Sequence, residues 1–163
     1  IHTASLLSDG RVLVAGGNNN PGSSAVFDPV SNTWTATNPI GANFVFHTAT
    51  TLASGRVLLT GGNSNPQATR IFDPGAGAWS AGPTLINLHY FHAATLLADG
   101  RALVAGGYNT YNFTETLAFL PPNGAPCASD AGCNSGFCVD GVCCNNACAG
   151  AGCLGCSVAA GAG

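Results

Sequence analysis

Short apolar runs separated by turn residues recur along most of the chain, and none has the 3.6-residue period of an amphipathic helix. In the clearest stretch, residues 47–53 predict a strand that ends at Ser54-Gly55, and residues 56–60 predict its returning partner. Glycine at such a place favours a two-residue hairpin turn, because these turns need a positive φ. Residues 68–72 predict a third strand, and a fourth begins at Trp79. The pattern therefore predicts four short antiparallel strands and an all-β chain.

The same pattern occurs three times at one interval. His2, His47 and His92 lie 45 residues apart, and an arginine and a glycine pair follow each of them at constant distances. A repeat of this length builds a core by stacking similar units, because one unit cannot bury its own apolar face. The interval predicts units over about residues 1–40, 41–85 and 86–122.

Each unit resembles the kelch motif. The resemblance rests on Leu-Leu-x-Asp-Gly-Arg before the glycine pair, then Phe-Asp at Asp28 and Asp73, then a tryptophan at Trp34 and Trp79. It implies four-stranded antiparallel blades of a β-propeller, three of them visible in residues 1–122. The third unit is about two residues longer after its glycine pair, and it lacks the aspartate and the tryptophan. We therefore expect the third blade to be incomplete.

Three blades are fewer than the roughly 4 to 8 that close a propeller ring. An open stack would expose apolar faces at both ends, which soluble proteins avoid. The chain also begins in the middle of a motif, at Ile1-His2. We expect either a fragment of a longer propeller or blades completed by another copy of the chain.

Charged side chains are rare. They make up 7% of the residues, lysine is absent, and the net charge is −3. Nucleic-acid binding requires clusters of arginine and lysine, so this class of partner is excluded. No apolar run is long enough to predict a membrane span. A surface of asparagine, threonine, serine and glycine suits a protein that contacts glycans, protein surfaces or copies of itself.

Residues 123–163 predict a second domain of a different kind. Eight cysteines fall within it and none before it: Cys127, Cys133, Cys138, Cys143, Cys144, Cys148, Cys153 and Cys156. An even, dense set in a segment with little core predicts a disulfide framework, with an Asp-Gly hairpin between Cys138 and Cys143. A zinc site is the alternative, but only Cys153 and Cys156 have its usual spacing. The segment resembles the short cysteine-rich modules of secreted bacterial surface proteins. Oxidised cysteines predict an extracellular, cell-surface or periplasmic location.

The chemically active side chains mostly recur with the repeat, which favours structural roles. We expect His2, His47 and His92 to hydrogen-bond a neighbouring backbone, since catalytic sites are rarely triplicated. The other recurring residues are interpreted as structural partners, turn formers and aromatic anchors: Arg11, Arg56, Arg101, Asp28, Asp73, Trp34 and Trp79. The repeated aspartates offer an alternative role in calcium binding.

Residues 87–92 resemble the Tyr-His segment of copper-radical oxidases of the galactose oxidase type. The residue before His92 is Phe91 instead of tyrosine, and the blades contain no cysteine for a cross-link. No catalytic residue, metal or cofactor is predicted. The sequence predicts an extracellular binding or structural protein, with a self-assembling surface or filament subunit as the alternative and the oxidase third. The expected binding residues lie in loops that vary among the units: Asn18, Asn19, Asn20, Asn63, Asn65, Tyr108, Asn109 and Tyr111.

Overall fold

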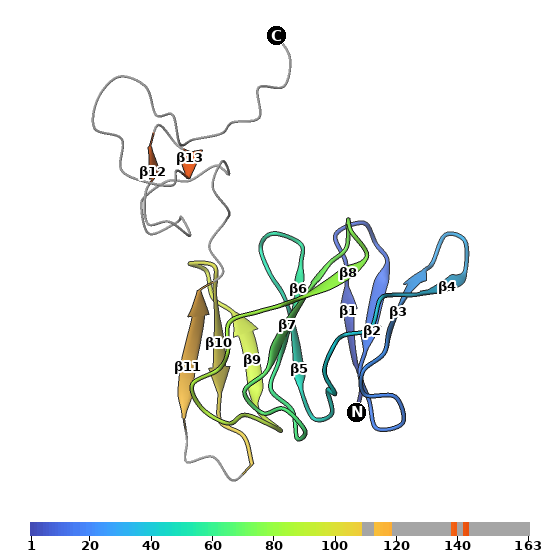
Figure 1. Cartoon of the computed structure of the whole chain (residues 1–163). Coiled ribbons are helices and arrows are strands. Elements are labelled where there is room, and N and C mark those ends of the chain that lie inside the picture. The colour runs from blue at the N-terminus through green and yellow to red at the C-terminus, as the bar shows by residue number, and fades with distance from the viewer. Residues whose placement is uncertain (109–112, 119–137, 140–141, 144–163) are drawn as a thin grey trace. The chain divides into compact units, whose positions relative to one another are not determined.

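Every regular element in the computed structural model is a β-strand (Figure 1). The structure describes residues 1–108, 113–118, 138–139 and 142–143. These residues belong to two units, Ile1–Ala118 and Phe119–Gly163. The predicted all-β fold is confirmed for the described residues. They form three antiparallel sheets in the first unit and do not close a ring.

The three sheets have the same strand order, in which each strand pairs with its neighbour along the chain. The first sheet consists of β1 (Thr3–Leu6), β2 (Val12–Ala15), β3 (Ser24–Asp28) and β4 (Thr33–Ala36). The second sheet consists of β5 (Thr48–Thr51), β6 (Val57–Thr60), β7 (Thr69–Asp73) and β8 (Ala78–Ala81). The third consists of β9 (Ala93–Leu96), β10 (Arg101–Ala105) and β11 (Thr114–Ala118). The predicted strands are present, with ends that differ by one or two residues.

The turn between the first two strands of each sheet differs from the prediction. In the first sheet the Leu7 amide donates to the Arg11 carbonyl (2.8 Å) and the Gly10 amide donates to the Leu7 carbonyl (3.0 Å). The loop therefore has three residues, and Gly10 takes the left-handed position with φ +87°. The same bonds recur in the second and third sheets. The predicted two-residue turn is wrong because the glycine is the last residue of a four-residue turn, Leu7–Gly10, and lies in a three-residue loop.

The third sheet keeps the interval of the other two. Its third strand starts at Thr114, which is 45 residues after Thr69 in the second sheet. The predicted lengthening of this unit is therefore wrong. A fourth strand of this unit, which we expected to be missing or incomplete, would follow β11, and those residues lie outside the described part of the chain.

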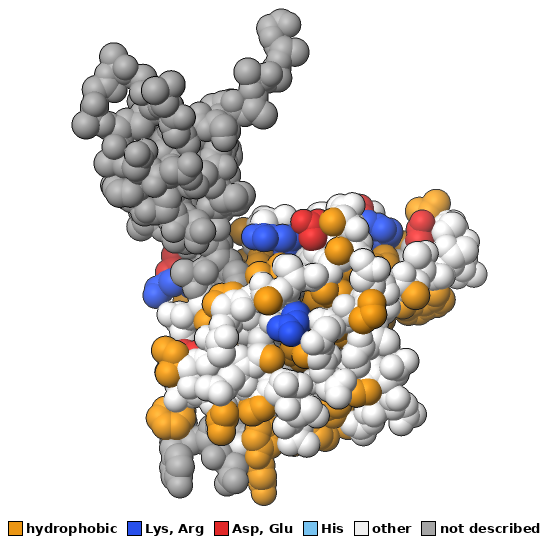
Figure 2. All heavy atoms as spheres, viewed as in Figure 1, with side chains coloured by type: hydrophobic (Ala, Val, Ile, Leu, Met, Phe, Trp, Pro, Cys, Tyr) orange, Lys and Arg blue, Asp and Glu red, His pale blue; other side chains and the backbone are white. Residues whose placement is uncertain are grey.

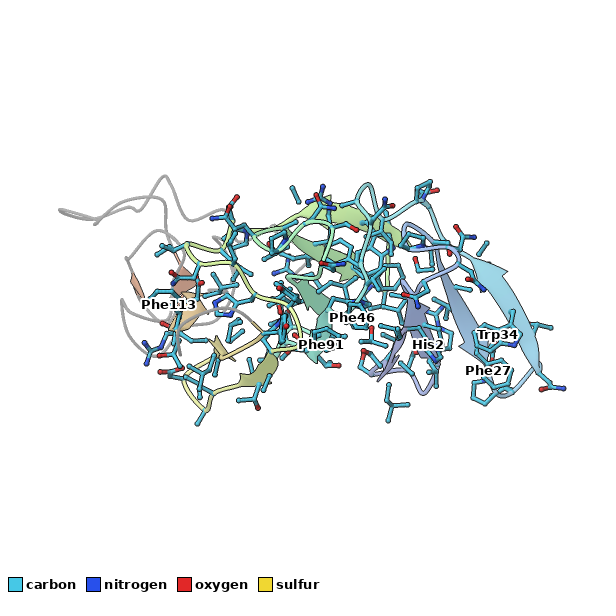
Figure 3. All side chains as sticks on the ribbon, turned by 90° about the horizontal axis from the view of Figure 1, so that it is seen from below. His2, Phe27, Trp34, Phe46, Phe91 and Phe113 are labelled. Carbon is cyan, nitrogen blue, oxygen red and sulfur yellow. The ribbon has the colours of Figure 1, made fainter. Side chains whose placement is uncertain are left out.

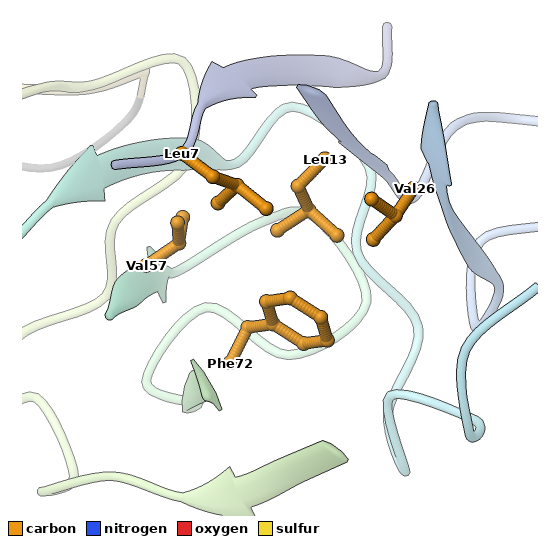
Figure 4. Close-up of a cluster of buried hydrophobic side chains, with 5 residues drawn as sticks. All are labelled: Leu7, Leu13, Val26, Val57 and Phe72. Carbon is orange, nitrogen blue, oxygen red and sulfur yellow. The ribbon is translucent and has the colours of Figure 1, made fainter. Parts of the chain in front are cut away.

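The first strands of the three sheets, β1, β5 and β9, lie next to one another. Between the first two sheets, Leu7, Leu13 and Val26 face Val57 and Phe72 (Figure 4). All four residues of β6 are buried because the second sheet has a neighbour on each face. All four residues of β4 are exposed. Burial of the apolar side chains between adjacent sheets is the main source of stability in this unit.

In the second unit, β12 (Cys138–Val139) and β13 (Val142–Cys143) form an antiparallel pair in which Cys138 is opposite Cys143. The predicted small hairpin is confirmed. The remaining six cysteines lie outside the described residues, so the disulfide framework stays a prediction.

Candidate functional site

A histidine joins each later sheet to the sheet before it. His47 Nε2 lies 2.9 Å from the Thr3 hydroxyl, and His92 Nε2 lies 3.0 Å from the Thr48 hydroxyl. His92 Nε2 also lies 2.9 Å from the hydroxyl of Thr60. These partners are side-chain hydroxyls, so the predicted bond to a neighbouring backbone is wrong for both histidines. His2 is exposed at the start of the first sheet.

The glycine pairs leave the space that these histidines occupy. A Cβ on Gly16 would lie 2.5 Å from the Phe44 carbonyl oxygen and 2.7 Å from His47 Cε1. The Gly17 amide donates to that same carbonyl at 3.0 Å. Gly61 occupies the equivalent place next to His92. Both first glycines have positive φ, so backbone conformation and close approach require glycine together.

Burial lowers the pKa of His47 and of His92 to about 4, because a charged ring would lose its hydration between the sheets. The two residues are 7% and 8% exposed. Their Nδ1 atoms are buried and have no hydrogen-bond partner in the described part of the chain. These features fit neutral rings that hold the sheets together.

A second histidine contact was missed in the sequence. His89 is fully buried, and its Nδ1 donates to the Gly106 carbonyl at 2.8 Å. Its Nε2 lies 2.9 Å from Oε1 of Glu115, whose carboxylate also accepts the backbone amides of Ile86 and Asn87. Glu115 lies 45 residues after Arg70, so alignment of the repeats would have marked it as a position that changes charge.

Four aromatic side chains meet where the connections into the second and third sheets end. Phe46 and Phe91 lie 3.9 Å apart between ring centroids, and Tyr90 contacts Phe91 at 6.0 Å and Tyr108 at 5.9 Å. We call Phe46, Tyr90, Phe91 and Tyr108 the aromatic patch. Phe91 is 58% exposed and Tyr108 is 66% exposed. Figure 3 shows Phe46 next to Phe91, and Figure 2 shows apolar side chains gathered along the lower edge of the molecule.

The two phenylalanines of the patch have unusual backbones. Phe46 has φ 60° and Phe91 has φ 54°, the left-handed region that bulky residues rarely adopt. The Phe91 amide donates to the Phe46 carbonyl at 3.0 Å, which links the two segments. Strain of this kind persists where the surrounding structure fixes it, and it concentrates at functional sites.

Of the predicted binding residues that the structure describes, only Tyr108 belongs to the aromatic patch. Asn18, Asn19 and Asn20 are exposed in the loop between β2 and β3, and Asn63 is exposed after the second glycine pair. Asn65 is half-buried and donates from Nδ2 to the Asn43 carbonyl at 3.3 Å. Asn109 and Tyr111 lie outside the described residues. The sequence reasoning missed Phe46 and Phe91 because it assigned binding to variable loops, whereas these rings stand at a repeat position.

Two of the recurring arginines pair with an aspartate of their own turn, and Arg11 also donates from Nη2 to the Pro74 carbonyl, just after β7 of the second sheet, at 3.3 Å. Arg11 pairs with Asp9 and Arg101 with Asp99, each at 2.7 Å, and a hydrogen bond from Arg101 holds the pKa of Asp99 below its usual value. Arg56 donates to the Ser54 hydroxyl at 3.2 Å.

Asp28 and Asp73 each accept two backbone amides of the turn that follows. The bond from the Val30 amide lowers the pKa of Asp28. Both aspartates are therefore turn formers, as one of the predictions had it.

Trp34 and Trp79 stand at equivalent places with different surroundings. Each ring contacts the phenylalanine on the adjacent strand, at 5.0 Å for Phe27 and 5.1 Å for Phe72. Trp79 also reaches the first sheet, where its Nε1 donates to the Ser24 hydroxyl at 2.8 Å. Trp34 is 59% exposed on the outermost strand β4, and Figure 3 shows it beside Phe27 of β3.

The residues that suggested a copper centre do not fit one in the described part of the chain. Nε2 of His89 and Nε2 of His92 are both committed to hydrogen bonds, and Tyr90 packs against other rings. Among the described residues, no group of three or more histidine, cysteine and acidic side chains is placed to hold a metal ion. The described part of the chain contains no helix that is long and apolar enough to span a bilayer.

No family model matches the sequence, and no curated protein matches it. The fold is similar to that of a solved structure described as a novel fungal alcohol oxidase with catalytic diversity among the AA5 family, in complex with copper. The TM-score is 0.61 at 17% sequence identity, over 73% of this chain and 28% of that one. The chain thus spans less than a third of the length of that protein. At this identity the likeness concerns the fold alone.

Proposed function

We propose that the three sheets are kelch-type propeller blades and that the protein is an extracellular binding protein that recognises a glycan at the aromatic patch. Phe46 and Phe91 carry this proposal, since their strained backbones hold flat rings together at the surface. Exposed aromatic rings pack against the apolar faces of sugars, while nearby asparagine amides supply polar contacts. Neighbouring loops place Asn63 and Asn65 at the same end of the sheets.

The extracellular location is supported by the composition. Eight cysteines crowd one segment, and lysine is absent from the whole chain. Such cysteine usage is typical of oxidising compartments.

Binding of soluble oligosaccharides to the full chain, followed by calorimetry, tests the proposal. Phe91→Ala should weaken binding at least about tenfold, because it removes the most exposed contact of the ring pair. Val30→Ala, at a 95% exposed site in the turn after β3, is the matched control and should bind normally. If no glycan binds, or if Phe91→Ala binds as well as the wild type while a protein ligand is found, the glycan assignment is wrong.

A second candidate is self-assembly, which the exposed face of β4 favours. Trp34 on β4 and Phe27 on β3 repeat the arrangement by which Trp79 and Phe72 join the first sheet. An exposed apolar sheet face with this geometry is suited to pair with a further blade, as supplied by another copy. Trp34→Asp should abolish any association seen by sedimentation velocity at micromolar concentration. A wild-type chain that remains monomeric would refute this candidate.

A further inference from the structure

Arg70 is held in one orientation by three backbone carbonyls. Its Nε donates to the Ile40 carbonyl at 3.1 Å, its Nη1 to the Thr69 carbonyl at 2.8 Å, and its Nη2 to the Gly41 carbonyl at 3.2 Å. A guanidinium has five N–H groups in a fixed planar arrangement. Two N–H donors therefore remain, one on each terminal nitrogen, and we call this pair the outer fork of Arg70.

No carboxylate neutralises Arg70 within the described residues. The ion pairs found there join Arg11 to Asp9, Arg101 to Asp99, and His89 to Glu115. The side chain is half-buried, so its charge is not fully surrounded by water. An oriented fork of this kind matches the two oxygens of a carboxylate.

Arg70 lines a groove of about 470 Å³. Asn43 and Asn65 supply amide groups to its lining, and small or compact residues make up the rest: Gly22, Pro39, Gly41, Ala42 and Ala68. The side-chain nitrogen of Asn65 donates a hydrogen bond to the backbone carbonyl of Asn43. The side-chain oxygen of Asn65 is then available to accept a hydrogen bond. The groove thus combines one cation with neutral hydrogen-bonding groups and little bulk.

We propose that this groove binds the carboxylate of an acidic sugar, a uronic acid, through the outer fork of Arg70. Asparagine amides are suited to sugar hydroxyls, and the absence of large side chains leaves space for a pyranose ring. The chain has a net charge of −3, so one isolated cation favours a single carboxylate over a densely charged polyanion. The groove is lined by none of the aromatic-patch residues, and the proposal does not depend on sugar binding there.

Trigalacturonate, its methyl ester and neutral galactotriose are the probes, titrated into the full chain and followed by NMR. Trigalacturonate should bind, and the methyl ester should bind at least about tenfold more weakly, because esterification removes one charge-assisted hydrogen-bonded pair. Binding should also weaken as salt rises. Equal affinity for acid and ester, or preference for an acidic peptide of equal charge, would overturn the assignment.

Two variants locate the site. Arg70→Gln should lose trigalacturonate binding, with Arg56→Gln as a control for the loss of one positive charge. Arg70→Gln also removes the hydrogen bonds to three backbone carbonyls. Asn43→Asp therefore provides an independent test, because it places a carboxylate in the groove and leaves these three hydrogen bonds in place. Its control is Ser54→Asp, which adds the same charge at a turn where the other two sheets already have aspartate. Binding that survives Asn43→Asp, or that falls equally in Ser54→Asp, would refute the site.

Discussion

Replacement of Trp79 by phenylalanine should separate the contact between the first two sheets from the stability of either sheet alone. The indole N–H of Trp79 crosses to the first sheet and donates to Ser24 at 2.8 Å, with Thr37 at 3.3 Å. The ring also packs against both apolar clusters between these sheets. Phenylalanine keeps the aromatic contact with Phe72 but removes the donor and part of the ring.

The expected loss follows from these two contributions. The hydrogen bond contributes about 1 kcal/mol, and the space left by the smaller ring costs about 1–2 kcal/mol. The free energy of unfolding should therefore fall by about 2–3 kcal/mol in Trp79→Phe. For a chain of this length that corresponds to a decrease in Tm of roughly 4–12 °C. Trp34→Phe is the matched control, and its effect should stay within about 0.5 kcal/mol because Trp34 is mostly exposed.

Urea unfolding followed by circular dichroism measures both variants. A double-mutant cycle with Ser24→Ala isolates the cross-sheet bond and should give a coupling of about 1 kcal/mol. The reasoning fails if Trp79→Phe is neutral, if Trp34→Phe costs as much, or if Ser24→Ala has the same effect with and without the indole.

Three further outcomes are expected. His47 and His92 have a pKa of about 4 in the folded chain against 6.5 in the unfolded chain. Their contribution to the free energy of unfolding is therefore fully present above pH 6.5 and is lost as the pH falls toward 4. The loss should be about 3 kcal/mol for each histidine, and His92→Gln should flatten urea-derived stability against pH. Glu115→Gln should cost roughly 1–3 kcal/mol, since an amide cannot accept from all three donors, and an unchanged urea midpoint would refute this. Complete reduction of four disulfides by a thiol reagent should raise the intact mass by eight hydrogen atoms, whereas stoichiometric zinc with free thiols would contradict the disulfide framework.

The apolar pattern and its 45-residue interval were sufficient to predict the strands, because both depend on residues close together in the chain. The turn type was missed because a glycine after an aspartate fits both a two-residue and a three-residue loop. The histidine partners were missed for a different reason. Thr3 lies 44 residues before His47, and only the packing of one sheet on the next brings the two together. Glu115 was overlooked because the kelch resemblance weakens in the third unit.

Equivalent positions at the two joints between sheets carry opposite chemistry, which bears on how a repeat keeps its order. Arg70 donates to carbonyls of the connection before the second sheet, whereas Glu115 accepts amides of the connection before the third. Phe44 occupies the first joint at the place where His89 occupies the next. A shift of one unit would set a guanidinium against amide donors and a carboxylate against carbonyl oxygens. Mismatched contacts of this kind disfavour the wrong pairing. Similar strands therefore build each sheet, whereas the contacts that fix the connection entering each sheet differ from one unit to the next.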